Sequence, residues 1–201
     1  MKKVVFICSH LYSGSNALYE AMNNHSRIQG YSGLNRYLSC LQLLTLCEFN
    51  HKTKNRSAIY MDEIIYNHQI SSKEIYKYCK FIYIIRRPEI PINFMISNDK
   101  IKSNFALSYY KLRMRRICEM AKRTPGSVLL TYDDLSEGRG LDLISEYLEL
   151  PQPIEFSPSS LNSLNRNFGT DLLAKGLRSE VEDSYERYLY FLRNLSLRQP
   201  Q

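Results

Sequence analysis

Three short runs of apolar, mostly β-branched residues constrain the fold of this chain more than any other feature. They occupy residues 4–7, 81–85 and 128–130. Each run is continuously apolar and does not alternate with polar residues, which is typical of strands covered on both faces in a parallel sheet. Segments with helical spacing lie between the runs. The order of elements therefore predicts an α/β fold with a central parallel sheet.

Weaker patterns complete this outline. Two further strand candidates would extend the sheet: residues 58–61 and a segment around Ile28. Helical spacing of apolar residues marks three segments: the one after Gly14, 34–46 and 104–122. Two capping-box pairs, each a Ser followed three residues later by a Glu, predict helix starts at Ser71 and Ser179.

The length of 201 residues suits one domain. We expect a single domain over residues 1–201, with an α/β core at 1–150 and a loop and C-terminal helices at 151–201. The boundary rests on the segment 151–170, which is rich in Pro, Ser and Asn and reads as a loop. The helices beyond it are predicted to form a helical cap.

Charge and cysteine content narrow the function classes. Lys and Arg number 27 against 20 acidic residues, a net charge of +7, which favours an anionic partner. No run of five or six basic residues occurs, so a localised anion site is expected, not a nucleic-acid-binding arm. The five cysteines form no CxxC pair, which argues against a zinc site or disulfide framework and for a reducing compartment. No apolar stretch approaches the roughly 20 residues of a membrane span, and we expect a cytoplasmic protein.

The first predicted strand leads into a turn of small polar residues, Ser9 to Asn16, and then into a helix. Backbone N–H groups and the helix dipole make such a turn a cradle for anions, and Ser hydroxyls add donors. The turn lacks the second Gly and the Lys of a Walker A loop. The alternative interpretation is a capped strand-to-helix turn with no ligand.

Two later predicted strands are also followed by residues that could contact a bound anion or nucleotide. Arg86 follows the run at 81–85, at the edge where open α/β sheets bind ligands, and its guanidinium suits a phosphate. Tyr132 follows the run at 128–130 and is itself followed by two acids. The alternatives are an exposed Arg86 paired with Glu89, and a helix N-cap with a packed Tyr132.

Taken in this order, the motifs resemble those of the sulfotransferases that use 3′-phosphoadenosine 5′-phosphosulfate (PAPS), in particular the tyrosylprotein and carbohydrate branch. That family has PRSGTT or PKSGTT after the first strand, then Asn/Asp-His-Pro, then KF, apolar residues and R-D/N-P, and later an aromatic residue before YEDL. This chain has LYSGSN at 11–16, NHS at 24–26, KFIYIIRRP at 80–88 and TYDDL at 131–135. The resemblance covers about residues 4–150 and implies a P-loop-type three-layer fold.

The resemblance also implies roles for single residues. Five consecutive loop residues would hold the 5′-phosphosulfate of PAPS: Tyr12, Ser13, Gly14, Ser15 and Asn16. Arg86 would hold the 3′-phosphate, Tyr132 would lie against the adenine, and His25 would be structural. The implied partners are the cofactor PAPS and an acceptor with a hydroxyl or an amine, with no metal and no nucleic acid. Neither the acceptor nor the oligomeric state follows from the sequence.

This chain departs from the family pattern at the positions nearest the chemistry. Tyr12 stands where the family has a basic residue, Phe94 where it has a Ser that binds the 3′-phosphate, and Met61 where it has a Lys. Asn93 or Ser97 would have to replace that Ser, and the Glu base of some members falls near residues 32–33. The cofactor frame is thus recognisable, whereas the catalytic set is largely replaced.

The candidates for the missing base are His10 before the loop and Asp62 and Glu63 after the fourth strand candidate. His10 has an ordinary pKa near 6.5, is mostly neutral at pH 7, and precedes the loop. Asp62 is expected to end the fourth strand candidate on the same sheet edge. For each, the alternative is a polar residue at a strand end with no catalytic role.

Three functions remain open from the sequence. The first is transfer of a sulfuryl group from PAPS to a hydroxyl or amine. The second is a sulfotransferase-like binding module that has lost catalysis, which the replaced residues favour. The third is a P-loop kinase with Asp133 or Asp134 as its metal ligand, although the P-loop Lys is missing.

Overall fold

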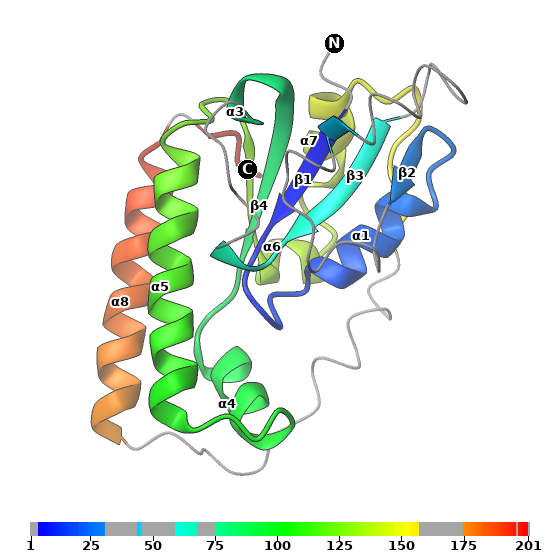
Figure 1. The fold of residues 1–201 in the computed structure, drawn as a ribbon. Coiled ribbons are helices and arrows are strands. Elements are labelled where there is room, and N and C mark those ends of the chain that lie inside the picture. Colours follow the sequence, from blue (N-terminus) through cyan, green and yellow to red (C-terminus); the bar gives the residue numbers. More distant parts are fainter. Residues whose placement is uncertain are drawn as a thin grey trace.

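A five-stranded parallel sheet forms the centre of the protein in the computed structural model, which describes residues 4–30, 44–45, 59–67, 75–156, 175–195 and 197–200. Its strand order is β2-β3-β1-β4-β5 (Figure 1). The strands are β1 (Val4–Cys8), β2 (Ile28–Gly30), β3 (Ile59–Ile64), β4 (Cys79–Ile85) and β5 (Val128–Thr131). All pairs are parallel, so the carboxyl ends of the strands share one edge.

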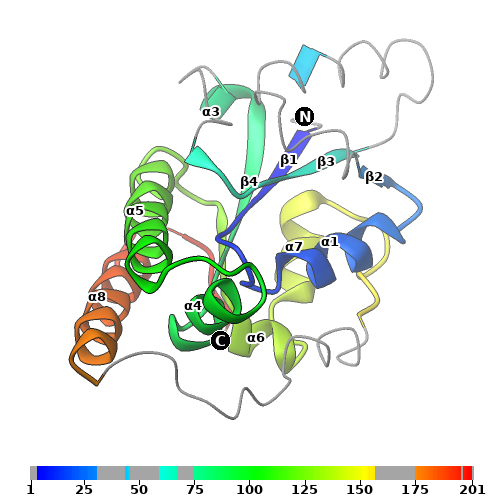
Figure 2. The same ribbon diagram turned by 60° about the horizontal axis from the view of Figure 1, so that its bottom comes forward.

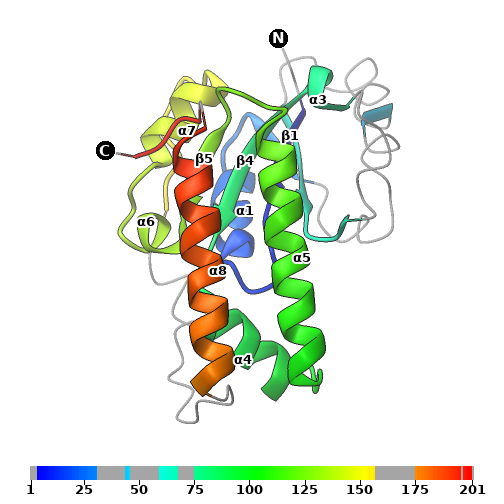
Figure 3. The same ribbon diagram turned by 90° about the vertical axis from the view of Figure 1, so that its left-hand side faces the viewer.

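Helices cover both faces of the sheet. On one face, α5 (Ser103–Ala121) and α8 (Lys175–Arg193) lie side by side (Figure 3). On the other face lie α1 (Ser15–Asn23), α6 (Tyr132–Ser136) and α7 (Leu141–Leu148) (Figure 2). The short α3 (Ile75–Tyr78) precedes β4, and α4 (Glu89–Ser97) lies beyond the carboxyl ends of the strands. Successive strand residues point to opposite faces, which gives two apolar cores and explains the continuously apolar runs.

The predicted α/β fold with a central parallel sheet is confirmed. All three strong strand predictions match β1, β4 and β5, and the two weaker ones match β3 and β2. The C-terminal helix is α8, which packs along α5. Its predicted start at Ser179 is wrong, because the helix already begins at Lys175 and Ser179 is an exposed residue within it. The helix start at Ser71 and most of 34–46 lie outside the described residues. None of the described helices is both long enough and apolar enough to cross a membrane.

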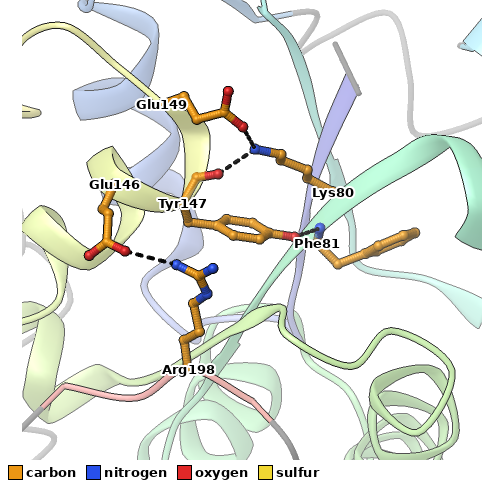
Figure 4. Close-up of polar contacts among 6 residues, drawn as sticks. All are labelled: Lys80, Phe81, Glu146, Tyr147, Glu149 and Arg198. Carbon is orange, nitrogen blue, oxygen red and sulfur yellow. Dashed lines mark hydrogen bonds and ion pairs between the residues drawn. The ribbon is translucent and has the colours of Figure 1, made fainter. Parts of the chain in front are cut away.

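At the edge of the sheet where the strands begin, opposite their carboxyl ends, polar contacts attach α7 and the C-terminal segment to the sheet (Figure 4). The Phe81 N–H donates to the hydroxyl of Tyr147 over 3.1 Å, and the Lys80 ammonium donates to the Tyr147 carbonyl. Arg198 pairs with Glu146 at 3.1 Å, and its backbone bridges to the start of β5. These contacts stabilise the packing of α7 and the C-terminal segment on the sheet. The cavities described below lie at the carboxyl ends of the strands.

Candidate functional site

The loop between β1 and α1 has the backbone of an anion cradle. Tyr12 and Gly14 both adopt positive φ, 61° and 93°, and the Ser13 N–H donates to the carbonyl of His10 over 3.2 Å. This conformation turns the chain from β1 directly into α1, where the N–H groups of Ser15 and Asn16 precede the first helical hydrogen bond, from Ala17 to Gly14. The hydroxyl of Ser13 is buried without a partner among the described residues. The loop therefore presents unsatisfied donors at a helix N-terminus, where anions are favoured.

Arg86 brings a buried cation to this loop. It follows the end of β4, is only 3% exposed, and donates from Nη1 to the carbonyl of Tyr12 over 3.3 Å. Its guanidinium lies 3.5 Å from the centre of the Tyr132 ring. Burial lowers the pKa of Arg86, and the neighbouring Tyr132 and Asp133 oppose this shift. The predicted exposed alternative, with Arg86 paired to Glu89, does not describe this arginine.

Tyr132 connects the segment 131–135 with the loop and with Arg86. It is the first residue of α6, which a capping box opens: the hydroxyl of Thr131 accepts from the Asp134 N–H, and the Asp134 carboxylate accepts from the Thr131 N–H. The N-cap interpretation of this segment is thus confirmed. The ring of Tyr132 lies so close to Gly14 that a Cβ there would come within 2.8 Å of it. Loop, strand-end arginine and tyrosine therefore pack as one unit.

Both ring nitrogens of His10 are hydrogen-bonded, and the residue is wholly buried. Its Nε2 accepts from the Arg86 N–H over 3.0 Å, and its Nδ1 donates to the carbonyl of Leu11 over 2.9 Å. The ring also meets that of Tyr110 edge-on at 5.0 Å. Burial is the main cause that lowers the pKa of His10 to about 4, so its neutral form accepts protons poorly. These contacts suit a residue that fixes the position of Arg86.

Asp62 does not end its strand, contrary to the expectation from the sequence. The strand β3 continues through Asp62 to Ile64, because the apolar Ile64 fills a further core position. Asp62 is buried and lies opposite Phe6 in the register with β1, two residues before the carboxyl end. Met61, at the position of the family's Lys, is fully buried in the core.

Arg113 is a site residue that sequence reasoning missed. It lies on α5, is fully buried, and donates from Nε to the carbonyl of Ser9 over 2.7 Å and from Nη2 to the carbonyl of Ile64. One side chain thereby ties together the carboxyl ends of β1 and β3. The available signal was its spacing: Arg113 falls on the same helix face as Tyr110 and Ile117, both buried.

On α4, Phe94 and Ser97 are engaged with other residues, whereas Asn93 is not fully satisfied. Phe94 stacks on the ring of Tyr12, with 4.8 Å between centroids. The Ser97 hydroxyl donates to the carbonyl of Asn93 over 2.7 Å. Asn93 itself is buried, and its Oδ1 has no partner among the described residues. Of the two suggested replacements, Asn93 is the one with free hydrogen-bonding capacity.

Two cavities flank the unit formed by the loop and Arg86. One, of about 470 Å³, is lined by three arginines (Arg86, Arg87 and Arg178), by the rings of Tyr132 and Tyr185, and by two acidic residues, Glu89 and Asp133, so basic residues outnumber acidic ones. The other, of about 690 Å³, is lined by the loop, by Ile65 and Tyr66 after β3, and by residues of α4, α5 and the connection between them. The basic cavity suits a phosphate-bearing ligand, and the second lies against the N-terminus of α1.

Comparison with solved structures identifies the architecture. A sulfotransferase domain from the curacin biosynthetic pathway superposes with a TM-score of 0.60 at 14% identity, over 93% of this chain and 97% of that one. The mouse sulfotransferase SULT7A1, solved in complex with PAP, gives a TM-score of 0.54 at 14% identity, over 96% of this chain and 86% of that one. This chain has the sulfotransferase fold. No protein-family profile and no curated protein matches it by sequence.

Within this sulfotransferase fold, three of the four motifs that carried the resemblance meet at the edge where the strands end, and the motif at 24–26 lies apart from them. Gly14, Arg86 and Tyr132 come from three separate segments and meet beyond the ends of β1, β4 and β5. His25 follows α1 and accepts the Arg27 N–H at Nδ1 over 3.2 Å, which suits its expected structural role. The positions near residues 32–33 lie outside the described residues.

Proposed function

We propose that this protein binds PAPS and transfers its sulfuryl group to an acceptor with a hydroxyl or an amine. The observation that carries the proposal is the contact of buried Arg86 with both the Tyr132 ring and the Tyr12 carbonyl. This arrangement presents a guanidinium, an aromatic face and a donor-rich loop to one ligand. The PAP bound to the mouse sulfotransferase of the same fold is a ligand of that kind.

The residues present fit this cofactor. The buried hydroxyl of Ser13, which lacks a partner in the described part of the chain, and the first N–H groups of α1 suit the 5′ phosphosulfate. Arg86 suits the 3′-phosphate, with Arg87 and Arg178 lining the same cavity. When bound, PAPS supplies an activated sulfuryl group. The chain's own contribution would be to position it, with Arg86 at the 3′-phosphate, and to stabilise negative charge that grows at the loop through the fixed N–H dipoles there.

A second candidate is a binding module of the same fold without catalysis. Tyr12 provides no cation at the loop, and the pKa of His10, lowered to about 4, makes it a weak base. The roles predicted for His10 and Asp62 as bases stay predictions. The kinase alternative loses its argument for Asp134, whose carboxylate closes the capping box of α6. Assignment to the tyrosylprotein and carbohydrate branch rests on the motifs alone.

Nucleotide selectivity tests the proposal. Wild-type protein is titrated with PAP (3′,5′-adenosine bisphosphate) and with AMP, which lacks the 3′-phosphate. Stabilisation is followed by thermal shift, which reports ligand excess over Kd. PAP should bind at least about tenfold tighter than AMP. Arg86→Ala should remove that difference, a loss on the order of 1.5–3 kcal/mol for a charge-assisted contact.

Arg115→Ala is the matched control, because Arg115 is an exposed arginine on α5. It removes the same charge and should leave the preference for PAP intact. Equal affinity of the wild-type protein for PAP and AMP would rule out the assignment of Arg86. Selective PAP binding without sulfuryl transfer to any of a panel of phenols, alcohols and amines would favour the binding module.

A further inference from the structure

The cavity of about 690 Å³ has a place in the site that the sequence did not reveal. Its lining includes Gly14, Ser15 and Asn16, so a molecule inside it lies against the loop and the start of α1. It is a different cavity from the basic one beside Arg86. If the loop holds the phosphosulfate, as the proposed function states, this cavity is where an acceptor reaches it.

The walls of this cavity are mainly apolar and aromatic. Four Tyr and Phe rings contribute to it, those of Tyr12, Tyr66, Phe105 and Tyr109, together with the imidazole of His10. Among its described lining residues there is no Lys or Arg, whereas three arginines and two acidic residues line the cavity beside it. The two cavities therefore differ in charge, and an anionic acceptor would gain no cationic partner from the described walls.

Asp99 carries a carboxylate in this aromatic cavity. The hydroxyl of Tyr12 lies 2.8 Å from each of its two carboxylate oxygens. The Tyr12 ring is itself stacked on Phe94, so the hydroxyl that holds the carboxylate has a fixed position. Within the described part of the chain, Tyr12 is its one hydrogen-bond donor, and a carboxylate accepts up to about four hydrogen bonds. Asp99 thus keeps capacity for a donor on a ligand.

The geometry points to an acceptor that carries a protonated amine on an apolar body, with the carboxylate of Asp99 binding the amine. An ammonium group donates charge-assisted hydrogen bonds to a carboxylate and is attracted to the faces of aromatic rings. The apolar body fits against the aromatic walls, and the group that receives the sulfuryl is directed towards the loop. This inference rests on the proposed function for the identity of the cavity as the acceptor site.

The test uses two probes of nearly the same shape, tyramine and 4-propylphenol, which differ in an ammonium against a methyl group. Each is titrated calorimetrically into the full chain saturated with PAP. Tyramine should bind about fivefold tighter or more, and the preference should shrink at high salt because Asp99 is exposed. Asp99→Asn, which keeps size and shape, should abolish the preference. Glu155→Gln removes one negative charge at an exposed position outside the cavity and should preserve it.

Equal binding of the two probes, no binding of either, or a preference that survives Asp99→Asn would each overturn the inference. PAP affinity is measured separately on the same samples, and the probes are also titrated without PAP. Failure of PAP binding with an intact, Asp99-dependent amine preference would count against the proposed function and not against the amine site. Intact PAP binding without the amine preference would count only against the amine site.

Discussion

Gly14 decides, at the scale of one residue, whether the loop and Tyr132 fit together. Its φ of 93° strains any side chain, and a Cβ would also lie 2.8 Å and 3.1 Å from two atoms of the Tyr132 ring. We predict that Gly14→Ala costs about 2–4 kcal/mol of unfolding free energy, from backbone strain plus the clash. Displacement of the Tyr132 ring should also weaken PAP binding. Urea unfolding and PAP titration measure the two effects.

Gly138→Ala separates the clash from the strain. Gly138 has a similar φ of 72°, but a Cβ there would meet no atom within 4 Å. This variant should therefore show the backbone cost alone, about 1–2 kcal/mol, with unchanged PAP affinity. Equal destabilisation by the two substitutions, with PAP binding retained in both, would show that Tyr132 does not depend on Gly14.

Helix α6 illustrates, at the scale of an element, how capping serves the site. The Thr131 hydroxyl accepts from the Asp134 N–H over 3.1 Å and donates to the Asp134 carboxylate over 2.7 Å. Thr131→Val keeps the shape and removes both contacts, so we predict a loss of about 1 kcal/mol in stability. Because α6 begins with Tyr132, PAP affinity should fall as well. Ser184→Ala, on α8 and outside both cavities, removes an exposed hydrogen bond and should leave PAP affinity unchanged.

The strands were predictable because burial on both faces leaves a local trace, a continuous apolar run. Arg86 and Tyr132 were predictable as neighbours of the ligand because parallel strands end at one edge. Arg113 was not, since its partner Ser9 is 104 residues away and only the packing of α5 brings them together. Asp99 belongs to no motif, and its role depends on contact with Tyr12, 87 residues earlier. Long-range contacts of this kind leave no periodic signal in the sequence.

In the whole molecule, one edge of the sheet carries structural contacts and the other carries the candidate site. Where the strands begin, Tyr147 and Arg198 hold α7 and the C-terminal segment in place (Figure 4). Where they end, Arg113 and His10 fix the loop and β4, and the two cavities open beside them. Helix α8 contributes Arg178 to the basic cavity, so segments from both the first 150 residues and the remainder build the site.

Global stability should depend on pH through His10. Burial and the nearby cations Arg113 and Arg86 lower its pKa from 6.5 to about 4 in the folded protein, and its hydrogen bonds to Leu11 and Arg86 oppose the shift. Between these two pH values the unfolded chain binds a proton that the folded protein does not, so stability falls as the pH falls. The slope approaches about 1.4 kcal/mol per pH unit, and the total is on the order of 3 kcal/mol.

His10→Gln tests this dependence, because a side-chain amide can still accept the Arg86 N–H but does not titrate. Urea unfolding of both proteins is measured at about pH 8, 6 and 5. The wild-type protein should be the more stable at the highest pH, where the imidazole is neutral and makes both of its hydrogen bonds. Its advantage over the variant should shrink by about 1–2 kcal/mol at the lowest pH. Parallel stability curves for the two proteins would mean that His10 is not buried in its neutral form, and its place between Leu11 and Arg86 would have to be revised.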